Sequence, residues 1–342
     1  MSTVIKQLCL TFGTAILFIG LASYYLWLYY HTPASTNPQP QTVKIDKGTS
    51  LRHIATQLDS TGLIRNARMF IIYAALLHKG AHLQAGEYDL QATMSIAQIV
   101  DIMRKGGVIH YALTVPEGFT VRDIASLIEA KKLGKGQKVL SLSRDKAFIE
   151  SLGLAVSSLE GYLFPETYHV PRDISERDLL ALMVRTLETR YTANITAKGR
   201  KLEMTRHQVL TLASLIETEA QVDAERPLIA AVFHNRLQRG MRLQCDPTVI
   251  YALGERFDGN IRKADLNIDS PYNTYRYAGL PPGPIANPGQ RAIEAAVSPS
   301  SVDYLYFVAT GENGTHQFSP TLQAHNNAVR KYQLKRTRPS IQ

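Results

Sequence analysis

The 342-residue sequence contains only two cysteines, Cys9 and Cys245. Cys9 falls in an apolar N-terminal segment and Cys245 lies far downstream, so no disulfide between them is expected. The ten histidines show no metal-ligand spacing, and neither the phosphate-binding pattern G-x-x-x-x-G-K-[ST] nor the nucleophile pattern G-x-S-x-G occurs. These absences argue against a metal site, a P-loop nucleotide-binding site and a serine hydrolase of that type. The chemistry considered below needs no cofactor, and we expect none.

Acidic residues are fewer than basic ones. The 38 Lys and Arg against 29 Asp and Glu give a net charge of +9, which favours anionic partners such as nucleic acid, acidic lipid or an acidic wall polymer. The charge alone does not choose among these partners. At 45% hydrophobic and 20% charged residues, the composition excludes both a wholly disordered chain and a polytopic membrane protein.

One long hydrophobic run is present, the uncharged residues 8–30. As a helix rising about 1.5 Å per residue, it would span a hydrocarbon core of roughly 30 Å. A cleavable signal peptide is the alternative, but no A-x-A-like site occurs before Pro33. Aromatic residues gather at its downstream end and Lys6 precedes it, so we expect a single-pass plasma (inner) membrane anchor with the bulk of the chain on the periplasmic, extracytoplasmic side. That topology argues against a nucleic-acid partner.

Residues 31–42, rich in Pro, Ser, Thr and Asn, predict an extended linker. Residues 43–58 then recur at residues 113–128, and a looser third copy covers residues 86–103. Each copy predicts a strand, a turn at glycine, a hydroxyl cap and a helix. Such units resemble LysM-like carbohydrate-binding modules, and a generic α+β packing unit without a ligand is the alternative.

Downstream of about residue 185 the pattern is mostly helical, followed by a strand-like segment over residues 304–309 and a helix that Ser319 and Pro320 are expected to start. One of the helices carries two unusual glutamates. Thr205 and Gln208 form a capping-box pattern that opens a helix over residues 209–221. Glu217 and Glu219 fall within its broad apolar arc, while three hydroxyl residues, Thr211, Ser214 and Thr218, face away. Burying a carboxylate is costly unless it is paired or takes up a proton.

A buried carboxyl that keeps its proton can act as a general acid near neutral pH. The alternative is a structural ion pair, for instance of Glu219 with Arg226 or Arg236. Because Glu217 and Glu219 are two residues apart on a helix, they cannot flank one glycosidic bond. A single acid must therefore suffice, as in a transglycosylase whose glutamate protonates the leaving oxygen and then assists attack by a hydroxyl of the sugar itself.

Several motifs in one order resemble the endolytic murein transglycosylase family. They are EGYLFPETY (residues 160–168), LASLIETEA (212–220), VFHNRL (232–237), MRLQCDPTVIYALG (241–254), PYNTY followed by GLPPGPIANPG (271–289) and YLYFVA (304–309). The resemblance runs from about residue 43 to the C-terminus and includes the anchor. Two departures are Thr218, where relatives usually carry Lys or Arg, and Cys245, where Thr or Ser is usual.

The resemblance implies that Glu217 is the sole catalytic acid/base. It implies cleavage of the bond between N-acetylmuramic acid (MurNAc) and N-acetylglucosamine (GlcNAc) within nascent glycan strands. The products would carry 1,6-anhydro-MurNAc ends, and the cut would terminate strand elongation at the plasma membrane, with peptidoglycan synthases as possible partners.

The expected architecture is α+β in four parts. These are a cytoplasmic tip with the transmembrane helix (residues 1–30), the linker (31–42), a LysM-like module (43–112) and a mixed α+β catalytic domain (113–342). Around the acid we expect hydrogen-bonding and aromatic residues to hold the sugar, although a turn or packing role is the alternative for each. These candidate substrate-binding residues are Asn235, Gln244, Asp246, Tyr272, Asn273 and Tyr275.

Two other classes of function are open. A non-catalytic peptidoglycan-binding scaffold would keep the repeats and tolerate loss of Glu217. A peptidase would use Ser143 and Lys146, which match the S-x-x-K pattern of penicillin-binding enzymes, but the K-T-G motif of those enzymes is absent.

Overall fold

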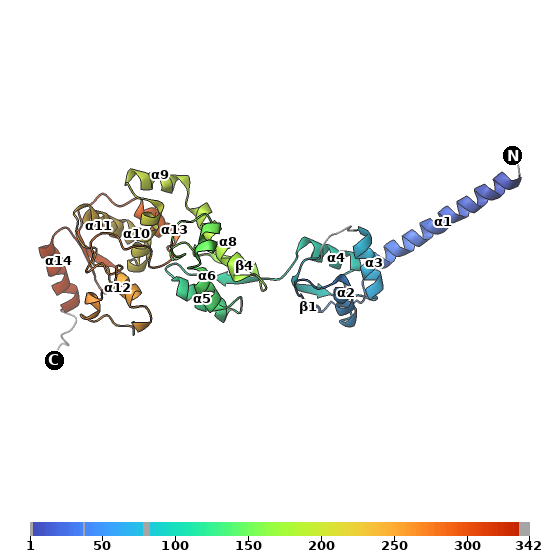
Figure 1. Cartoon of the computed structure of the whole chain (residues 1–342), viewed down its shortest axis with the longest axis horizontal. Coiled ribbons are helices and arrows are strands. Elements are labelled where there is room, and N and C mark those ends of the chain that lie inside the picture. The colour runs from blue at the N-terminus through green and yellow to red at the C-terminus, as the bar shows by residue number, and fades with distance from the viewer. Residues whose placement is uncertain (1–2, 37, 78–82, 335–342) are drawn as a thin grey trace. The chain divides into compact units, whose positions relative to one another are not determined.

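The structure, a computed structural model, describes residues 3–36, 38–77 and 83–334, so both ends of the expected architecture, residues 1–2 and 335–342, lie outside the described residues. The chain divides into two compact units. Unit 1 comprises Met1–Tyr111 and His169–Asp173, and unit 2 comprises Ala112–Tyr168 and Ile174–Gln342. Helices and two-stranded sheets occur in the described parts of the chain (Figure 1), which confirms the expected α+β class.

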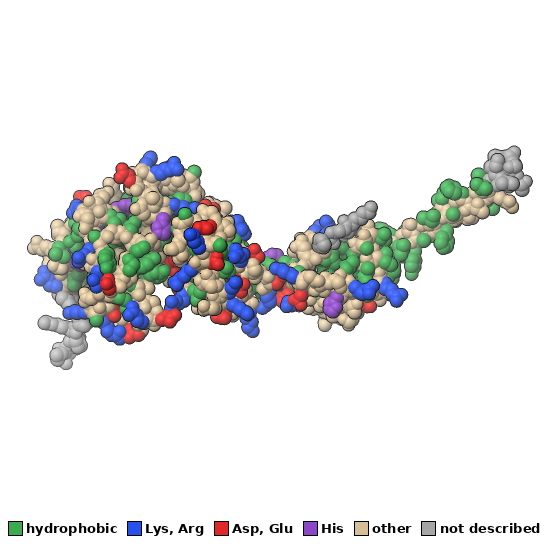
Figure 2. All heavy atoms as spheres, in the orientation of Figure 1, with side chains coloured by type: hydrophobic (Ala, Val, Ile, Leu, Met, Phe, Trp, Pro, Cys, Tyr) green, Lys and Arg blue, Asp and Glu red, His purple; other side chains and the backbone are tan. Residues whose placement is uncertain are grey.

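The first helix, α1 (Thr3–His31), is long and apolar enough over Gln7–His31 to cross a membrane. Its large apolar side chains are exposed, and Figure 2 shows them along this helix. Only its end is tied into unit 1, where Tyr30 is buried with its ring centroid 4.6 Å from that of Tyr73. A soluble helix with this much exposed apolar surface would be unfavourable, so the expected membrane-spanning helix fits the structure.

Unit 1 is built on an antiparallel pair, β1 (Pro40–Ile45) and β2 (Gly86–Gln91), in which Val43 lies opposite Tyr88. Three helices pack with this sheet around one core: α2 (Leu51–Ser60), α3 (Ala67–Leu77) and α4 (Ile96–Lys105). The linker prediction was too long at its C-terminal end. Residues 40–42 belong to β1 because their backbones pair with β2.

All three predicted repeat copies form a strand, a turn and a capped helix. The helix caps are Ser50 for α2, Ser95 for α4 and Thr120 for α5 (Val121–Ala130). Gly48 and Gly118 have φ of +83° and +79°, a conformation that residues with a Cβ rarely adopt. The recurring glycine and hydroxyl are therefore explained by local backbone geometry.

Strand β3 (His110–Thr114) pairs with β4 (Thr167–Pro171), and the boundary between the units falls within both strands. Unit 2 is otherwise mainly helical (Figure 1). Besides α5, its helices are α6 (Gly136–Leu142), α7 (Lys146–Ser151), α8 (Glu176–Arg190), α9 (Ala193–Lys201), α10 (Arg206–Glu219), α11 (Arg226–Gln238), α12 (Asp246–Leu253), α13 (Gln290–Ala296) and α14 (Leu322–Val329).

Helix α10 lies at the centre of unit 2, packed against α9, α11, α12 and α13. The predicted capping box of Thr205 and Gln208 is present. The prediction of a polar face was wrong, because Thr211 and Ser214 are buried and Thr218 is partly buried. Their hydroxyls donate to carbonyls of the preceding turn of α10, which satisfies them without solvent.

The C-terminal part of unit 2 contains a hairpin of β5 (Tyr306–Ala309) and β6 (His316–Ser319). The predicted strand over residues 304–309 is therefore shorter, and β6 was not predicted. Ser319 ends β6, and the side chain of Thr321 caps α14. Ser319 was predicted to start the helix, but it pairs with β5 across the hairpin instead.

Candidate active site

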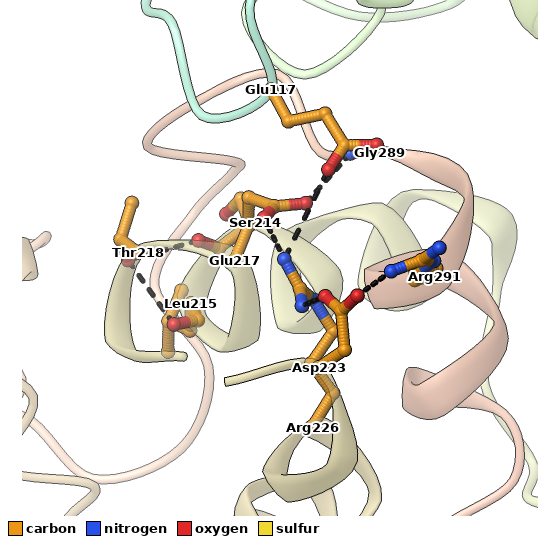
Figure 3. Close-up of polar contacts among 9 residues, drawn as sticks. All are labelled: Glu117, Ser214, Leu215, Glu217, Thr218, Asp223, Arg226, Gly289 and Arg291. Atoms are coloured by element: carbon orange, nitrogen blue, oxygen red, sulfur yellow. Dashed lines mark hydrogen bonds and ion pairs between the residues drawn. The ribbon is translucent and has the colours of Figure 1, made fainter. Parts of the chain in front are cut away.

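Glu217 lies in the last turn of α10 with its side chain only 5% exposed. Its Oε1 accepts a hydrogen bond from Arg226 Nη2 at 2.7 Å, and its Oε2 accepts one from the backbone N–H of Gly289 at 2.8 Å (Figure 3). Both partners stabilise a carboxylate. Arg226 thus pairs with Glu217 and not with Glu219, the residue for which an ion pair was the leading alternative.

Arg226, in the first turn of α11, is 8% exposed and is held from a second side. Its Nη1 donates to Asp223 Oδ1, and the other oxygen of Asp223 pairs with Arg291 on α13 (Figure 3). The buried Nε of Arg226 has no acceptor among the described residues. These charges place Arg226 between two carboxylates, which keeps a buried cation compensated.

A cavity of about 490 Å³ adjoins this network. Asp223, Arg226 and Arg291 line it together with Lys198, Glu294 and residues of α9 and α13. Glu217 itself is not in the lining. Arg226 is therefore the group that links the buried carboxylate to an accessible concave surface.

A second carboxyl, Glu117, stands next to Glu217 (Figure 3). Its Oε2 is 3.9 Å from Arg226 Nη2, and its side chain is 47% exposed. Burial raises the pKa of Glu117, the negative charge of Glu217 raises it further, and Arg226 and Arg291 oppose both effects. Sequence spacing points only to Glu219 as a second carboxyl near Glu217, because Glu117 comes from a distant segment.

Glu219 interacts with a different neighbour, the buried thiol of Cys245. Burial raises the pKa of both groups. The two cysteines are both free, as expected, with Cys9 exposed on α1 and Cys245 buried. Cys245, where relatives usually carry Thr or Ser, therefore lies next to Glu219.

Three of the predicted substrate-binding residues come together at one surface. Gln244 and Asp246 are exposed on the segment that enters α12, and the hydroxyl of Tyr275 donates to Asp246 Oδ1. Gln244 has φ of +51°, and its N–H donates to the carbonyl of Thr274, which ties this segment to the one that carries Tyr275. Tyr272 packs instead on Tyr251, with ring centroids 4.8 Å apart.

The amides of the two predicted asparagines are engaged within the protein. Asn235 Nδ2 donates to the carbonyls of Val302 and Tyr304, and the buried Asn273 donates to those of Leu266 and Ile268. The described hydrogen bonds of Glu217 go to Arg226 and Gly289, and to none of the six predicted residues. Sugar contact stays a prediction for all six.

The chain matches the YceG-like family over residues 43–331. It belongs to that family. A protein of Bacillus subtilis (strain 168) named endolytic murein transglycosylase is 38% identical over 307 residues, which cover 85% of this chain and 84% of the relative. A protein of Streptococcus pneumoniae with the same name is 34% identical over 326 residues, and the match spans 85% of this chain but 58% of that longer protein.

A crystal structure also resembles this YceG-like chain. The 2.6 Å structure of a putative YceG-like protein from Listeria monocytogenes has 38% sequence identity and a TM-score of 0.59. The match covers 85% of this chain and 99% of the Listeria chain. The likeness extends over both compact units, which agrees with the family match.

Glu160, the first residue of the motif EGYLFPETY, is also buried in the YceG-like chain. Its Oε1 accepts hydrogen bonds from the N–H of Val121 and from Asn287 Nδ2. Burial raises the pKa of Glu160 to about 8, and the hydrogen bonds from Val121 and Tyr251 offset this effect only in part. Glu160, Arg144 and Tyr251 line a separate cavity of about 360 Å³.

Proposed function

We propose that this chain is a membrane-anchored endolytic transglycosylase of peptidoglycan. It cleaves the bond between MurNAc and GlcNAc within glycan strands and leaves 1,6-anhydro-MurNAc ends. The family and the shared name of its relatives in Bacillus and Streptococcus support this activity. The observation that carries the proposal is the enclosed carboxyl of Glu217, which Arg226 joins to a concave surface lined by residues of both charges.

In this mechanism Glu217 is the central acid and base. Its protonated carboxyl gives a proton to the glycosidic oxygen as the bond to C1 of MurNAc breaks. The carboxylate then takes the proton of the C6 hydroxyl, whose oxygen closes onto C1. The proton that leaves Glu217 is thus replaced, and no water is consumed. An enclosed site favours this internal attack because it limits the access of competing water.

Substrate contacts are proposed on the exposed side of the same unit. Gln244 and Asp246 offer hydrogen bonds there, and Tyr272 and Tyr275 offer rings against which a sugar can pack. Asn273 would support the segment that carries the two tyrosines through its bonds to Leu266 and Ile268, whereas Asn235 holds the segment of Val302 and Tyr304. The cleavage would limit strand length, and a peptidoglycan synthase is the natural source of the nascent strand.

The proposed activity is tested with the full chain in detergent on purified sacculi. We expect fragments lighter by one water than hydrolysis products, and none from Glu217→Gln. Glu150→Gln is a matched control, because it removes an exposed carboxylate on α7 that pairs with the exposed Lys146. A fully active Glu217→Gln protein rejects the mechanism. Binding to sacculi without any cleavage by the unmodified chain favours the scaffold.

The anchor and unit 1 are assigned complementary roles. Helix α1 would hold the enzyme in the plasma membrane with both units on the periplasmic, extracytoplasmic side, and unit 1 would act as a LysM-like module that binds glycan. In cells the mature protein should keep its N-terminus and require detergent for extraction. Recovery of a processed, soluble form would refute the anchor.

A further inference from the structure

The backbone around Glu117 is fixed beside Glu217 by pairing with a distant loop. The N–H of Gly118 donates to the carbonyl of Asn287 at 2.9 Å, and the N–H of Asn287 donates to the carbonyl of Phe119 at 2.9 Å. A Cβ at Gly118 would lie 3.7 Å from Cγ of Glu217, so this turn packs directly on the buried glutamate. The position of Glu117 at the site is therefore set by the fold.

One guanidinium nitrogen serves both carboxyls. Arg226 Nη2 is 2.7 Å from Glu217 Oε1 and 3.9 Å from Glu117 Oε2. The Glu117 carboxyl rests against the backbone of Gly289, whose N–H binds Glu217, and Figure 3 shows the two acids converging there. A Cβ at Gly289 would overlap the Glu117 carboxyl. The two acids thus share Arg226 and meet at Gly289.

The two carboxyls differ in access and in charge stabilisation. Glu217 is 5% exposed and has a donor on each oxygen, whereas Glu117 is 47% exposed. Burial and the charge of Glu217 raise the pKa of Glu117. The two donors to Glu217 favour a carboxylate, yet the proposed reaction starts with a proton on Glu217. A route for that proton is required.

We propose that Glu117 and Glu217 alternate on Arg226, and that Glu117 supplies Glu217 with the proton for the first step. This inference rests on the proposed transglycosylase function. In the first of the two proposed states Arg226 holds Glu217, as in the 2.7 Å contact, and Glu117 carries the proton. In the second state, which is ready for the reaction, the proton has moved to Glu217 and the Glu117 carboxylate pairs with Arg226. One proton moves between two carboxyls, so charge and atoms balance.

The exchange is favourable for a buried arginine because Arg226 keeps a carboxylate partner in both states. Two neighbouring carboxyls resist being ionised together, which favours one proton shared between Glu117 and Glu217. The other charges that face them are Asp223, which pairs with Arg226, and Arg291, which pairs with Asp223. Glu117, the more exposed member, connects the pair to solvent. It acts through Glu217 and is a positioning residue.

The test is the pH dependence of anhydro-product formation by the full chain in detergent. In Glu117→Gln the neighbouring negative charge is lost, so the site holds its proton less tightly. We expect the alkaline limb of the profile to move down by about one pH unit, which corresponds to about a tenfold loss of rate above that limb. The rate should recover as the pH is lowered, and sedimentation with sacculi should be unchanged.

A second variant displaces Glu117 and leaves its charge in the protein. Gly289 has φ of −77° and ψ of 174°, which alanine adopts without strain, so Gly289→Ala adds only the Cβ that pushes the Glu117 carboxyl away. The same downward shift of the alkaline limb is expected. Glu150→Gln, which removes an exposed charge elsewhere, should keep the unmodified profile. Circular dichroism melting shows which variants fold.

The outcomes separate this inference from the function on which it rests. If the unmodified chain makes no anhydro products, the proposed function fails first. If it makes them and Glu117→Gln keeps the alkaline limb, or loses rate equally at every pH, the exchange on Arg226 is overturned. Should Glu117→Gln fail to fold, the limb of Gly289→Ala decides the matter in the same way.

Discussion

Ser214 Oγ accepts a hydrogen bond from the backbone N–H of Ile285 at 3.1 Å, and both groups are buried. This contact ties the helix that carries Glu217 to the loop that leads to Gly289. The hydroxyl also donates to the carbonyl of Thr211, so it acts both as a donor and as an acceptor. The position of the Gly289 donor therefore depends on a side chain one turn away from the catalytic candidate.

Ser214→Ala should destabilise the protein by about 1–3 kcal/mol, because it leaves the buried N–H of Ile285 without an acceptor. The same change should lower the rate of glycan cleavage by loosening the loop that holds Gly289. Thermal melting and product formation measure the two effects. Ser141→Ala, which removes an exposed hydroxyl that donates to the carbonyl of Lys138 in its own helix, is the control. Equal melting temperatures for both variants would contradict the expectation.

Arg226→Ala should destabilise the fold by about 3–5 kcal/mol, because it leaves Glu217 buried without its cation. Arg226→Ala combined with Glu217→Gln should recover part of that loss, since the uncompensated charge is then gone. The melting temperatures of the two single variants and the double variant measure this coupling. Lys146→Ala breaks an exposed pair and should leave the melting temperature unchanged. Strict additivity of the two changes would refute the coupling.

Glu160 should make the protein less stable as the pH rises. Its pKa is raised to about 8 in the folded protein, so the folded state binds the proton more tightly than the unfolded chain does. Glu160 makes its full contribution to the free energy of unfolding below the unfolded pKa of about 4.3. This contribution falls as the pH rises towards 8, by up to about 1.4 kcal/mol per pH unit.

Glu160→Gln mimics the protonated side chain and keeps a group that can accept from Val121 and Asn287. We expect this variant to melt at a higher temperature than the unmodified protein at pH 8, and the gap to close near pH 5. Comparing the two proteins across this range cancels the contributions of other titrating groups, including Glu219, whose pKa is also raised. A constant gap would show that Glu160 does not titrate there.

Cys245 should resist thiol reagents while the protein is folded. The thiol is buried, and burial raises its pKa well above the usual value, so little reactive thiolate is present at neutral pH. A Cys9→Ser chain isolates this thiol. We expect slow labelling in native buffer and rapid labelling in denaturant. Rapid native labelling would indicate that the segment entering α12 opens readily.

The features that could be predicted from sequence are those whose cause lies within a few residues. The hydroxyl caps Ser50 and Thr120, the positive-φ glycines Gly48 and Gly118, the capping box of α10 and the apolar run of α1 all belong to this class. Local backbone geometry and hydropathy specify them. The prediction failed where pairing with a distant segment took over, as for residues 40–42 in β1 and Ser319 in β6.

The amino-acid sequence by itself determined that Glu217 sits on a capped helix among apolar neighbours, because helical periodicity places it there. Only the tertiary structure decided its partners. Arg226 comes from the next helix, Gly289 from a loop 72 residues away and Glu117 from the turn before α5. No local propensity encodes such meetings, because they follow from how α10, α11 and α13 pack together. The charge environment of the buried carboxyl is therefore a property of the packed unit.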